Sequence, residues 1–359
     1  MSRLRRGAIT EAIEQASPGD QIRLQPGVYT ETIVADRAVT IFADVPGETV
    51  IVPPGDACGL SITADVTVIG LSFDCQGRRN TAIEIAGGAP SLSSLHIQRA
   101  GTGILAKNNA TPMVSHCLFS ECSNGIQVSE GAQAELADCR VEDTALYPLL
   151  VGKRSSAQVL RTRFSGTRMG GVVVMEGSHA GFRGCEWLGS PTADEKQRPF
   201  HAQLMVLATG EATLSESCRI ADGTAVGILI SGGVLNMTDS FVERNAWAGI
   251  EVTQQGRAGL IRCQVSGNQG AGLIVRDGST AQAGEVKVVR NTAAGVGILG
   301  PSYAEIKGSL ILGNFCGAVL REGARGRFED CDMRGNAQGS FSVSPDSRQE
   351  SVRVQTGGL

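Results

Sequence analysis

Apolar residues recur along this chain at a nearly constant interval. One column of small or apolar residues can be aligned from residue 71 to residue 331, and its successive members lie 22 to 24 residues apart, except for one interval of 33. The column contains Leu71, Leu95, Cys117, Cys139, Thr162, Cys185, Cys218, Ser240, Cys263, Val286, Ser309 and Cys331. Repeats of this length are typical of chains that stack one structural unit on the next.

Each repeat contains three short runs in which apolar residues alternate with other residues. Two residues after the column another apolar residue follows, as at Phe73 and Ile97. A second alternating pair comes later in the repeat, such as Ile250 and Val252, and a third run ends just before the column. Alternation at period 2 is typical of strands with one buried face. Three short strands per turn with Gly-rich corners predict an all-β, right-handed, single-stranded parallel β-helix of about 12 rungs of 22–23 residues.

One corner of the repeat carries asparagine on five successive rungs. These residues are Asn245, Asn268, Asn291, Asn314 and Asn336, each five positions after the column. Asn tolerates the left-handed conformation, and its amide can bond to the Asn of the next rung. We therefore expect a structural asparagine ladder here.

The expected organisation is a single β-helix domain over residues 1–359. Residues 8–16 form an amphipathic pattern with Ile9 and Ile13 on one face, which predicts a helix that caps the first rung. The expected parts are a cap helix and turn (1–20), irregular first rungs (21–70), regular rungs (71–345) with an insertion (190–203), and a partial last rung and tail (346–359). Since no amphipathic segment follows the last rung, we expect a further domain, a partner or a second copy to cover it.

Charge and hydropathy narrow the classes of partner. The formal net charge of −4 gives no electrostatic case for nucleic acid. No stretch approaches the roughly 18 apolar residues that a membrane span needs. The N-terminal MSRLRRGAITEAIEQA lacks the apolar region of a secretory signal. We therefore expect a cytoplasmic protein with free thiols.

The sequence also resembles a known superfamily. The segment AITEAIEQASPGDQIRLQPGVYTETIVADRAVTI, followed by GI-V and N-x-x-x-G rungs, is similar to the pectate-lyase-like β-helix superfamily, in the style of its generic right-handed β-helix repeat proteins. The resemblance covers essentially the whole chain. It implies the fold and leaves the activity open, because the superfamily contains lyases, hydrolases, epimerases, esterases and non-catalytic scaffolds. The site motifs of its polygalacturonases, pectin methylesterases, calcium-dependent pectate lyases and mannuronan epimerases are absent from this sequence.

The cysteines favour packing over chemistry. Six of the ten occupy the inward column, where they exchange with Leu, Val, Thr and Ser, and free Cys behaves as a small buried apolar residue. No C-x-x-C pair occurs and the four His are scattered, so we expect no metal and no cofactor. A disulfide between Cys117 and Cys139, on adjacent rungs about 4.8 Å apart, is sterically conceivable.

The best candidate for a binding surface lies near the insertion. Outward positions beside the column place Arg140, Arg163, Glu186 and Arg219 on four successive rungs, and Arg161 and Arg168 lie nearby. Like charges one rung apart repel unless carboxylates or a ligand intervene. This arginine-rich face is therefore either an anion-binding groove or a solvated face held by salt bridges.

A catalytic role for this face would need more groups. A lyase or epimerase acting on uronic acids needs a cation for the carboxylate, a base and an acid. Arg161 or Arg163 could supply the cation, while Lys153, His201 or Tyr147 could move protons.

Three functions are consistent with the sequence. The first is a non-catalytic β-helix module that serves as an interaction scaffold for a protein partner or an acidic carbohydrate. The second is a carbohydrate-active enzyme of lyase, epimerase or hydrolase type that acts on an acidic polysaccharide. The third is a structural protein whose copies stack end to end through the C-terminal rung. The missing catalytic motifs favour the scaffold.

If this face is an anion-binding groove, Arg161→Ala combined with Arg163→Ala should abolish binding of an acidic ligand, because the change removes two of the stacked cations. The melting temperature should stay nearly constant, since both side chains point outward. Binding measured by calorimetry that equals that of the unmodified protein would contradict the predicted groove.

Overall fold

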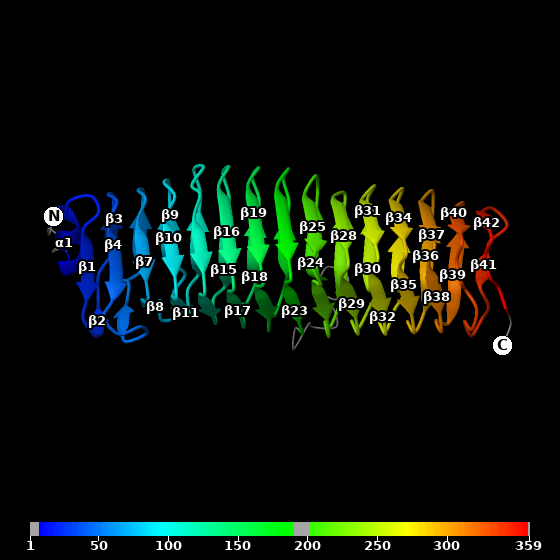
Figure 1. Ribbon diagram of the computed structural model, residues 1–359, viewed down its shortest axis with the longest axis horizontal. Helices are drawn as coiled ribbons and strands as arrows, with labels where there is room; N and C mark the ends of the chain where they lie inside the picture. Colours follow the sequence, from blue (N-terminus) through cyan, green and yellow to red (C-terminus); the bar gives the residue numbers. More distant parts are fainter. Residues whose placement is uncertain (1–6, 190–201, 358–359) are drawn as a thin grey trace. The chain divides into compact units, whose positions relative to one another are not determined.

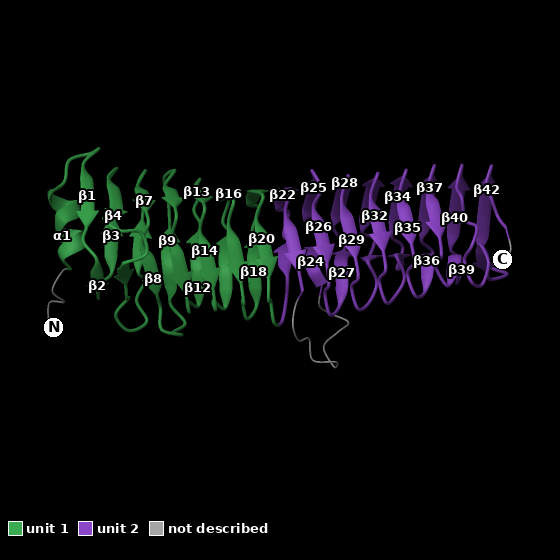
Figure 2. Cartoon of the chain, turned by 60° about the horizontal axis from the view of Figure 1, so that its bottom comes forward, with its two compact units in different colours: residues 1–168 green, residues 169–359 purple. Residues whose placement is uncertain are grey.

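Three kinds of short strand recur in a fixed order along the chain, and each kind pairs in parallel with its own copies in the neighbouring turns. The computed structural model describes residues 7–189 and 202–357. Over these residues the three kinds of strand number 15, 13 and 14, which corresponds to about 14 turns (Figure 1). The chain divides into two compact units, residues 1–168 and 169–359 (Figure 2). We name the sheets formed by the three kinds of strand A, B and C.

Unit 1 opens with one short helix and then follows the A, B, C order of strands. The helix is α1 (Ala8–Gln15). Sheet A contains β1 (Gln21–Leu24), β4 (Thr40–Ala43), β7 (Thr67–Ile69), β10 (Ser91–Ser93), β13 (Met113–Ser115), β16 (Gln133–Ala137) and β19 (Ser156–Leu160). Sheet B contains β2 (Gly27–Tyr29), β5 (Thr49–Ile51), β8 (Ser72–Asp74), β11 (His96–Gln98), β14 (Leu118–Ser120), β17 (Arg140–Glu142) and β20 (Arg163–Ser165). Sheet C contains β3 (Ile33–Ala35), β6 (Leu60–Ile62), β9 (Thr81–Ile85), β12 (Thr102–Ala106), β15 (Asn124–Val128) and β18 (Tyr147–Val151).

Unit 2 has the same three kinds of strand. Sheet A contains β22 (His179–Arg183), β25 (Glu211–Ser215), β28 (Val234–Thr238), β31 (Arg257–Ile261), β34 (Thr280–Gly284), β37 (Tyr303–Lys307), β40 (Arg325–Glu329) and β42 (Arg348–Val352). Sheet B contains β23 (Glu186–Leu188), β26 (Arg219–Ala221), β29 (Phe241–Glu243), β32 (Gln264–Ser266), β35 (Lys287–Val289) and β38 (Leu310–Leu312). Sheet C contains β21 (Val172–Val174), β24 (Ala202–Leu207), β27 (Val226–Ser231), β30 (Ile250–Thr253), β33 (Leu273–Val275), β36 (Ala294–Leu299), β39 (Cys316–Arg321) and β41 (Phe341–Val343).

The predicted all-β parallel solenoid is confirmed, and the expected number of rungs is too low by about two. The difference comes from the region that looked irregular, which forms complete turns of unequal length. Gln21 pairs with Thr40 and Thr40 pairs with Thr67, so two successive turns contain 19 and 27 residues. Changes of corner length hide a turn from a search for a constant interval, while the strands still stack in register.

The predicted capping helix is also confirmed, and a buried carboxylate holds its first turn. Ile9 and Ile13 of α1 are buried, as the amphipathic pattern predicts. The backbone N–H groups of Ile9 and Thr10 donate to the Glu31 carboxylate at 3.2 and 3.3 Å. A carboxylate at a helix N-terminus satisfies unpaired N–H groups and opposes the positive end of the helix dipole.

Hydrogen bonding explains why Cys, Ser and Thr exchange within the inward column. The Cys139 thiol donates to the carbonyl oxygen of Ala137 at 3.3 Å, and the Ser240 hydroxyl donates to that of Thr238 at 2.7 Å. Each side chain therefore bonds to the carbonyl group two residues earlier while it fills the interior. All ten cysteines are free thiols. Burial raises the pKa of the Cys263 thiol, so the thiol is neutral in the core.

The predicted asparagine ladder is present in unit 2, and all five of its side chains are buried. The Asn268 amide nitrogen donates to the amide oxygen of Asn291 at 2.9 Å, and Asn291 donates in the same way to Asn314 at 3.0 Å. Gln203, which the sequence pattern does not reveal, extends the ladder by donating to Asn245 at 2.8 Å. The left-handed conformation expected of the asparagines lies instead at the preceding residue, as at Arg290 with a φ of 57°.

A second ladder, of arginine and aspartate, follows the outer corners. Neighbouring turns place an Asp and an Arg one above the other, and both residues of a pair such as Asp239 and Arg262 have positive φ. The guanidinium of Arg262 binds the Asp239 carboxylate through two nitrogens, at 2.7 and 2.8 Å. The other pairs of this kind are Arg161–Asp138, Arg244–Asp222 and Arg353–Asp330. Arg99 similarly binds Asp74, the last residue of β8.

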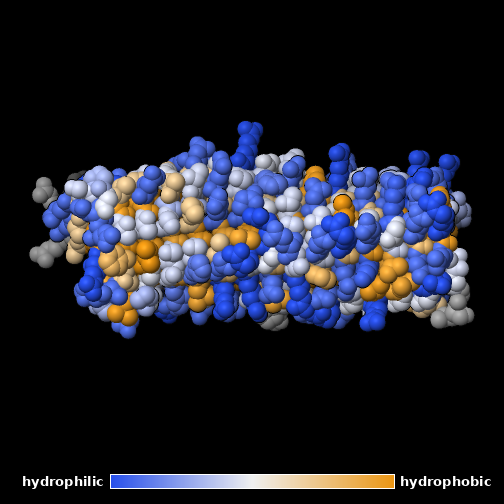
Figure 3. Space-filling view, in the orientation of Figure 1, coloured by the Kyte–Doolittle hydropathy of each residue, from blue (hydrophilic) through white to orange (hydrophobic). Residues whose placement is uncertain are grey.

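Polar side chains predominate on the face drawn in Figure 3, with apolar patches among them. Some large apolar side chains are well exposed, including Met113 in unit 1 at 56%, and Trp247 and Phe315 in unit 2 at 46% and 55%. Single exposed apolar side chains are ordinary on protein surfaces and do not by themselves mark a site.

We predict that Asn291→Ala lowers the free energy of unfolding by about 3 kcal/mol or more, because each buried polar group left without a partner costs about 1–3 kcal/mol. The change removes the acceptor of two bonds from Asn268 and one donor to Asn314. Denaturant unfolding measures the loss, with the exposed neighbour Gln269→Ala as control. Equal stability of the two variants would show that the ladder is dispensable.

The outer ladder predicts a pH dependence. The hydrogen bonds from Arg262 lower the pKa of Asp239 below its usual 3.8. A lowered folded-state pKa stabilises the fold above the unfolded-state pKa, and this contribution disappears as the pH falls through the folded-state value. Asp239→Asn should therefore lower the melting temperature at pH 7, and the difference from the unmodified protein should shrink below pH 3.8. Glu322→Gln, at an exposed corner, is the control and should change little at either pH.

Candidate functional site

The structure brings together some of the arginines predicted to form an anion-binding face. In unit 1, Arg140 of β17 and Arg163 of β20 are register partners, and both are exposed. In unit 2, Glu186 of β23 and Arg219 of β26 are register partners in the same way. Arg219 donates to the Glu243 carboxylate at 2.7 Å, so a carboxylate on the next turn already binds this cation.

The remaining predicted residues are dispersed over different parts of the turn. Arg161 lies at the corner between sheets A and B, where it binds Asp138. Tyr147 begins β18 on sheet C, and Lys153 lies at the next corner, 3.2 Å from Glu130. Exposed Arg168 follows β20, and His201 lies outside the described residues. Tyr147 and Lys153 therefore do not converge on Arg140 and Arg163 of sheet B.

A better-formed site lies on the outer face of sheet A in unit 2. Residues on β28, β31, β34, β37, β40 and β42 stack there in three rows. The first row is Val234, Arg257, Thr280, Tyr303, Arg325 and Arg348. The second row is Asn236, Gly259, Gln282, Glu305, Arg327 and Glu350. The third row is Thr238, Ile261, Gly284, Lys307, Glu329 and Val352.

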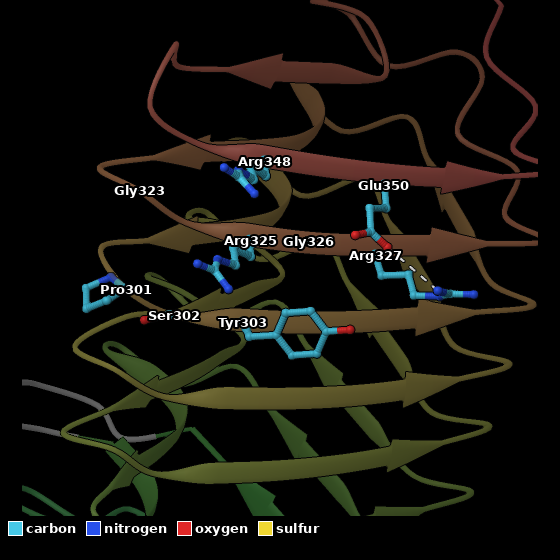
Figure 4. A pocket seen from close by; sticks show the side chains of 9 residues that line it. All are labelled: Pro301, Ser302, Tyr303, Gly323, Arg325, Gly326, Arg327, Arg348 and Glu350. Carbon is cyan, nitrogen blue, oxygen red and sulfur yellow. Dashed lines mark ion pairs between the residues drawn. The ribbon is translucent and has the colours of Figure 1, made fainter.

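Three hollows follow these rows. The first has a volume of about 510 Å³ and lies over β37, β40 and β42, where Tyr303, Arg325 and Arg348 line it (Figure 4). The second, of about 450 Å³, shares Tyr303 with the first. The third, of about 420 Å³, shares Asn236 and Gln282 with the second. Because neighbouring hollows have lining residues in common, we treat them as one feature and call it the sheet A groove.

A network of ion pairs occupies the second and third rows of the groove. Arg327 lies 3.2 Å from Glu329, 3.6 Å from Glu350 and 3.8 Å from Glu305. Lys307 lies 3.0 Å from Glu305 and 3.8 Å from Glu329. Both cations of this network are therefore already paired within the protein, and Glu329 also pairs with Arg353 at 3.4 Å.

The first row differs because its cations lack such partners. Among the residues that the structure describes, the side chains of Arg257, Arg325 and Arg348 make no ion pair or hydrogen bond. Arg325 and Arg348 are register partners on adjacent strands, which lie about 4.8 Å apart. Like charges on neighbouring strands repel unless an anion lies between them. The first hollow therefore contains two unpaired cations that could bind an anion.

Tyr303 adds a hydrogen-bonding aromatic group beside these cations. It is half-buried and pairs in register with Arg325 on one side and Thr280 on the other. Burial raises the pKa of its phenol, and the negative charge of Glu305 raises it further. The phenol therefore carries its proton at neutral pH and can donate it.

Sequence reasoning missed this groove for a physical reason. The outward positions of sheet A do not repeat a residue type, so periodicity gives them no weight, whereas the face near the insertion attracted attention because its arginines follow the inward column. The sequence does contain one signal of the groove. Arg325 and Arg348 are 23 residues apart, which is one turn, and no acidic residue occupies their position in the preceding turn.

Two further findings concern ligands and membranes. Within residues 7–189 and 202–357, no group of three or more His, Cys, Asp or Glu side chains could hold a metal ion. In the same part of the chain, no helix has the length and apolar character needed to cross a membrane.

Comparison with known families assigns the chain. A family model described as "Right handed beta helix region" matches residues 62–191, 102–261 and 248–354, which overlap to cover most of the sequence. The chain belongs to the right-handed β-helix family. This membership confirms the superfamily resemblance found from the sequence. No curated protein sequence matches the chain.

Several solved structures resemble this right-handed β-helix protein. The A-module of the Azotobacter vinelandii mannuronan C-5 epimerase AlgE6 superposes with a TM-score of 0.57 at 11% identity, over 98% of this chain and 94% of that one. The periplasmic alginate epimerase AlgG gives 0.60 at 12% identity, over 93% and 78%. The catalytic unit of the GH87 α-1,3-glucanase from Streptomyces thermodiastaticus gives 0.57 at 12%, over 96% and 65%. At these identities the likeness shows the fold.

These comparisons correct the functional expectation. The sequence favoured a non-catalytic scaffold because familiar catalytic motifs are missing, but the structures that the chain resembles are carbohydrate-active enzymes. Catalytic motifs written for one branch of this fold do not transfer to another, since a β-helix can carry a site on any of its faces. The scaffold hypothesis is therefore set aside.

Proposed function

We propose that this protein is a carbohydrate-active enzyme that acts on an acidic polysaccharide bound in the sheet A groove of unit 2. The observation that carries the proposal is the pair Arg325 and Arg348. These two guanidinium groups line one hollow as register partners, and no carboxylate neutralises them within the described part of the chain. A carboxylate of the substrate would remove their repulsion and could accept two hydrogen bonds from either guanidinium.

Tyr303 suits a sugar ring beside that carboxylate. Carbohydrate sites combine an aromatic surface with a few well-placed polar groups, because the faces of a sugar ring are apolar and its rim is polar. Tyr303 lies next to Arg325 in the row and lines both the first and the second hollow. A sugar over this ring would therefore place its carboxylate near the unpaired cations.

The first hollow also contains a base and an acid, which a reaction at the carbon beside a carboxylate requires. Elimination and epimerisation of uronic acids both begin with removal of the proton beside the carboxylate, after a cation has neutralised its charge. Arg325 and Arg348 would neutralise it, Glu350 would accept the proton, and the protonated Tyr303 phenol would donate one. Glu350 has a side chain that is 71% exposed and lies 3.6 Å from Arg327.

The comparisons support the general class. Two of the resembling structures are named for epimerisation of mannuronan or alginate, and a third for hydrolysis of a glucan. They support a polysaccharide as the substrate and do not choose among the three reactions. Their residues are not transferred to this chain.

Partner and location remain predictions from the sequence. The proposal takes the acidic carbohydrate as the ligand, rather than a protein, and moves the site from the predicted arginine face to the sheet A groove. The sequence predicts a cytoplasmic protein, whereas the structurally similar alginate epimerase AlgG is described as periplasmic. The sequence also leaves open that copies associate end to end through the last rung. Light scattering tests this association because it gives the molar mass in solution.

The test uses purified protein with polygalacturonate, polymannuronate, hyaluronan and gellan. Absorbance near 235 nm follows elimination, proton NMR follows inversion at the carbon beside the carboxylate, and new reducing ends follow hydrolysis. We expect activity on at least one polymer, and a loss of about 100-fold or more in kcat/KM in Arg325→Gln/Arg348→Gln, because each charge-assisted hydrogen bond contributes about 1.5–3 kcal/mol.

The matched control is Arg290→Gln, at an exposed corner outside the groove. It removes the same charge and should keep full activity. Absence of all three reactions on every acidic polymer would refute the proposed function. Activity that the double variant retains would place the site elsewhere.

A further inference from the structure

We propose that the sheet A groove selects a heteropolysaccharide in which neutral sugars separate the acidic ones, rather than a homopolymer of uronic acids. This inference rests on the proposed function and concerns the substrate class of the same site. The supporting observation is that some parts of the groove have unpaired cationic side chains and other parts have none.

Two of the unpaired cations, Arg257 and Arg325, stand at the ends of a stretch of the first row whose own side chains are uncharged. Along the first row, Arg257 pairs in register with Thr280, Thr280 with Tyr303, and Tyr303 with Arg325. Three strand spacings therefore separate Arg257 from Arg325, or about 14 Å. This distance is longer than one sugar ring, so a polymer that satisfies both cations carries at least one further sugar between its two acidic units.

Neutral polar groups lie beside this row in the second row. Gln282 of β34 lies on a strand between the two cations, and Asn236 of β28 lies one strand beyond Arg257. Asn236 and Gln282 are exposed, and their amides make no hydrogen bond to any described residue. Both amides line the second and third hollows together with Gly259. A Cβ atom at Gly259 would lie 3.0 Å from the Asn236 amide oxygen, so glycine keeps the floor of this part open. Amides both donate and accept, which suits hydroxyl and N-acetyl groups.

A carboxylate would be poorly placed in this stretch. Glu305 follows Tyr303 by two residues and faces the same side of sheet A. Its nearest cations, Lys307 at 3.0 Å and Arg327 at 3.8 Å, also pair with Glu329. A uronate at this point would meet a negative side chain and no unpaired cation, whereas a neutral sugar would meet amides and a phenol. A homopolymer cannot avoid this contact, because every one of its sugars is charged.

The experiment compares binding of three kinds of polymer to the full chain by calorimetry or affinity electrophoresis. Polygalacturonate represents the homopolymer, hyaluronan and gellan represent polymers in which neutral sugars separate uronates, and dextran is uncharged. We expect a separated-charge polymer to bind about tenfold more tightly than polygalacturonate, because two hydrogen bonds to the neutral amides amount to a difference of this size. Dextran should bind weakest.

Two sets of variants locate the effect. Asn236→Ala/Gln282→Ala should weaken the separated-charge polymer about tenfold and leave polygalacturonate nearly unchanged, since only a neutral sugar uses these amides. Arg257→Gln should weaken it by a similar factor. Gln269→Ala, an exposed amide at another corner, is the control. Equal melting temperatures confirm that the variants are folded.

The outcomes separate this inference from the proposed function. Tighter binding of polygalacturonate than of both separated-charge polymers, or a loss in the amide variant that is equal for all polymers, overturns the selectivity alone. Binding that does not depend on Arg325 and Arg348 for any polymer overturns the proposed function and the selectivity with it.

Discussion

The stacking of each turn on the next is the constraint on which the rest of this structure depends. Parallel pairing in register brings every side chain to within about 4.8 Å of its counterparts one turn before and one turn after. An inward position therefore has to fill the same space repeatedly, and an outward position has to tolerate its own neighbours. In a solenoid, each residue must therefore fit against the equivalent residues of the neighbouring repeats.

In the interior of the β-helix, this constraint favours polar side chains that find hydrogen-bond partners within their own or the next turn. The column residues Cys139 and Ser240 donate to carbonyl groups two residues earlier, so a thiol and a hydroxyl meet the same need. The asparagine ladder meets it differently, because each amide bonds to the amide of the next turn, as from Asn268 to Asn291. Both arrangements leave few buried polar groups unsatisfied, and both propagate along the axis.

On the outer surface of the β-helix, the same constraint makes the pairing of charged side chains informative about where a ligand could bind. Most stacked arginines have a carboxylate one turn away, as Arg262 has Asp239, and such pairs belong to the structural background of the surface. Arg325 and Arg348 break this rule because they stack on each other. A protein surface can tolerate such repulsion where a ligand relieves it. Stacked arginines without a carboxylate partner therefore indicate a ligand site better than the number of charged residues does. On the arginine face first suspected from the sequence, Arg161 binds Asp138 and Arg219 binds Glu243, while Arg140 and Arg163 are register partners.

The sequence by itself determined the architecture. The recurrence of apolar positions, the five asparagines and the amphipathic segment around Ile9 each specify a local structure that depends on repetition or on short-range geometry. Unequal turns near Thr40 escaped detection because corner length varies while strand register does not. The candidate site could not be predicted in the same way. Whether Arg219 is neutralised depends on Glu243 in the next turn, and whether Arg325 is unpaired depends on Arg348. Periodicity assigns a residue to a row, but only the tertiary structure decides which neighbouring rows its side chain can reach and hence which charges remain available to a ligand.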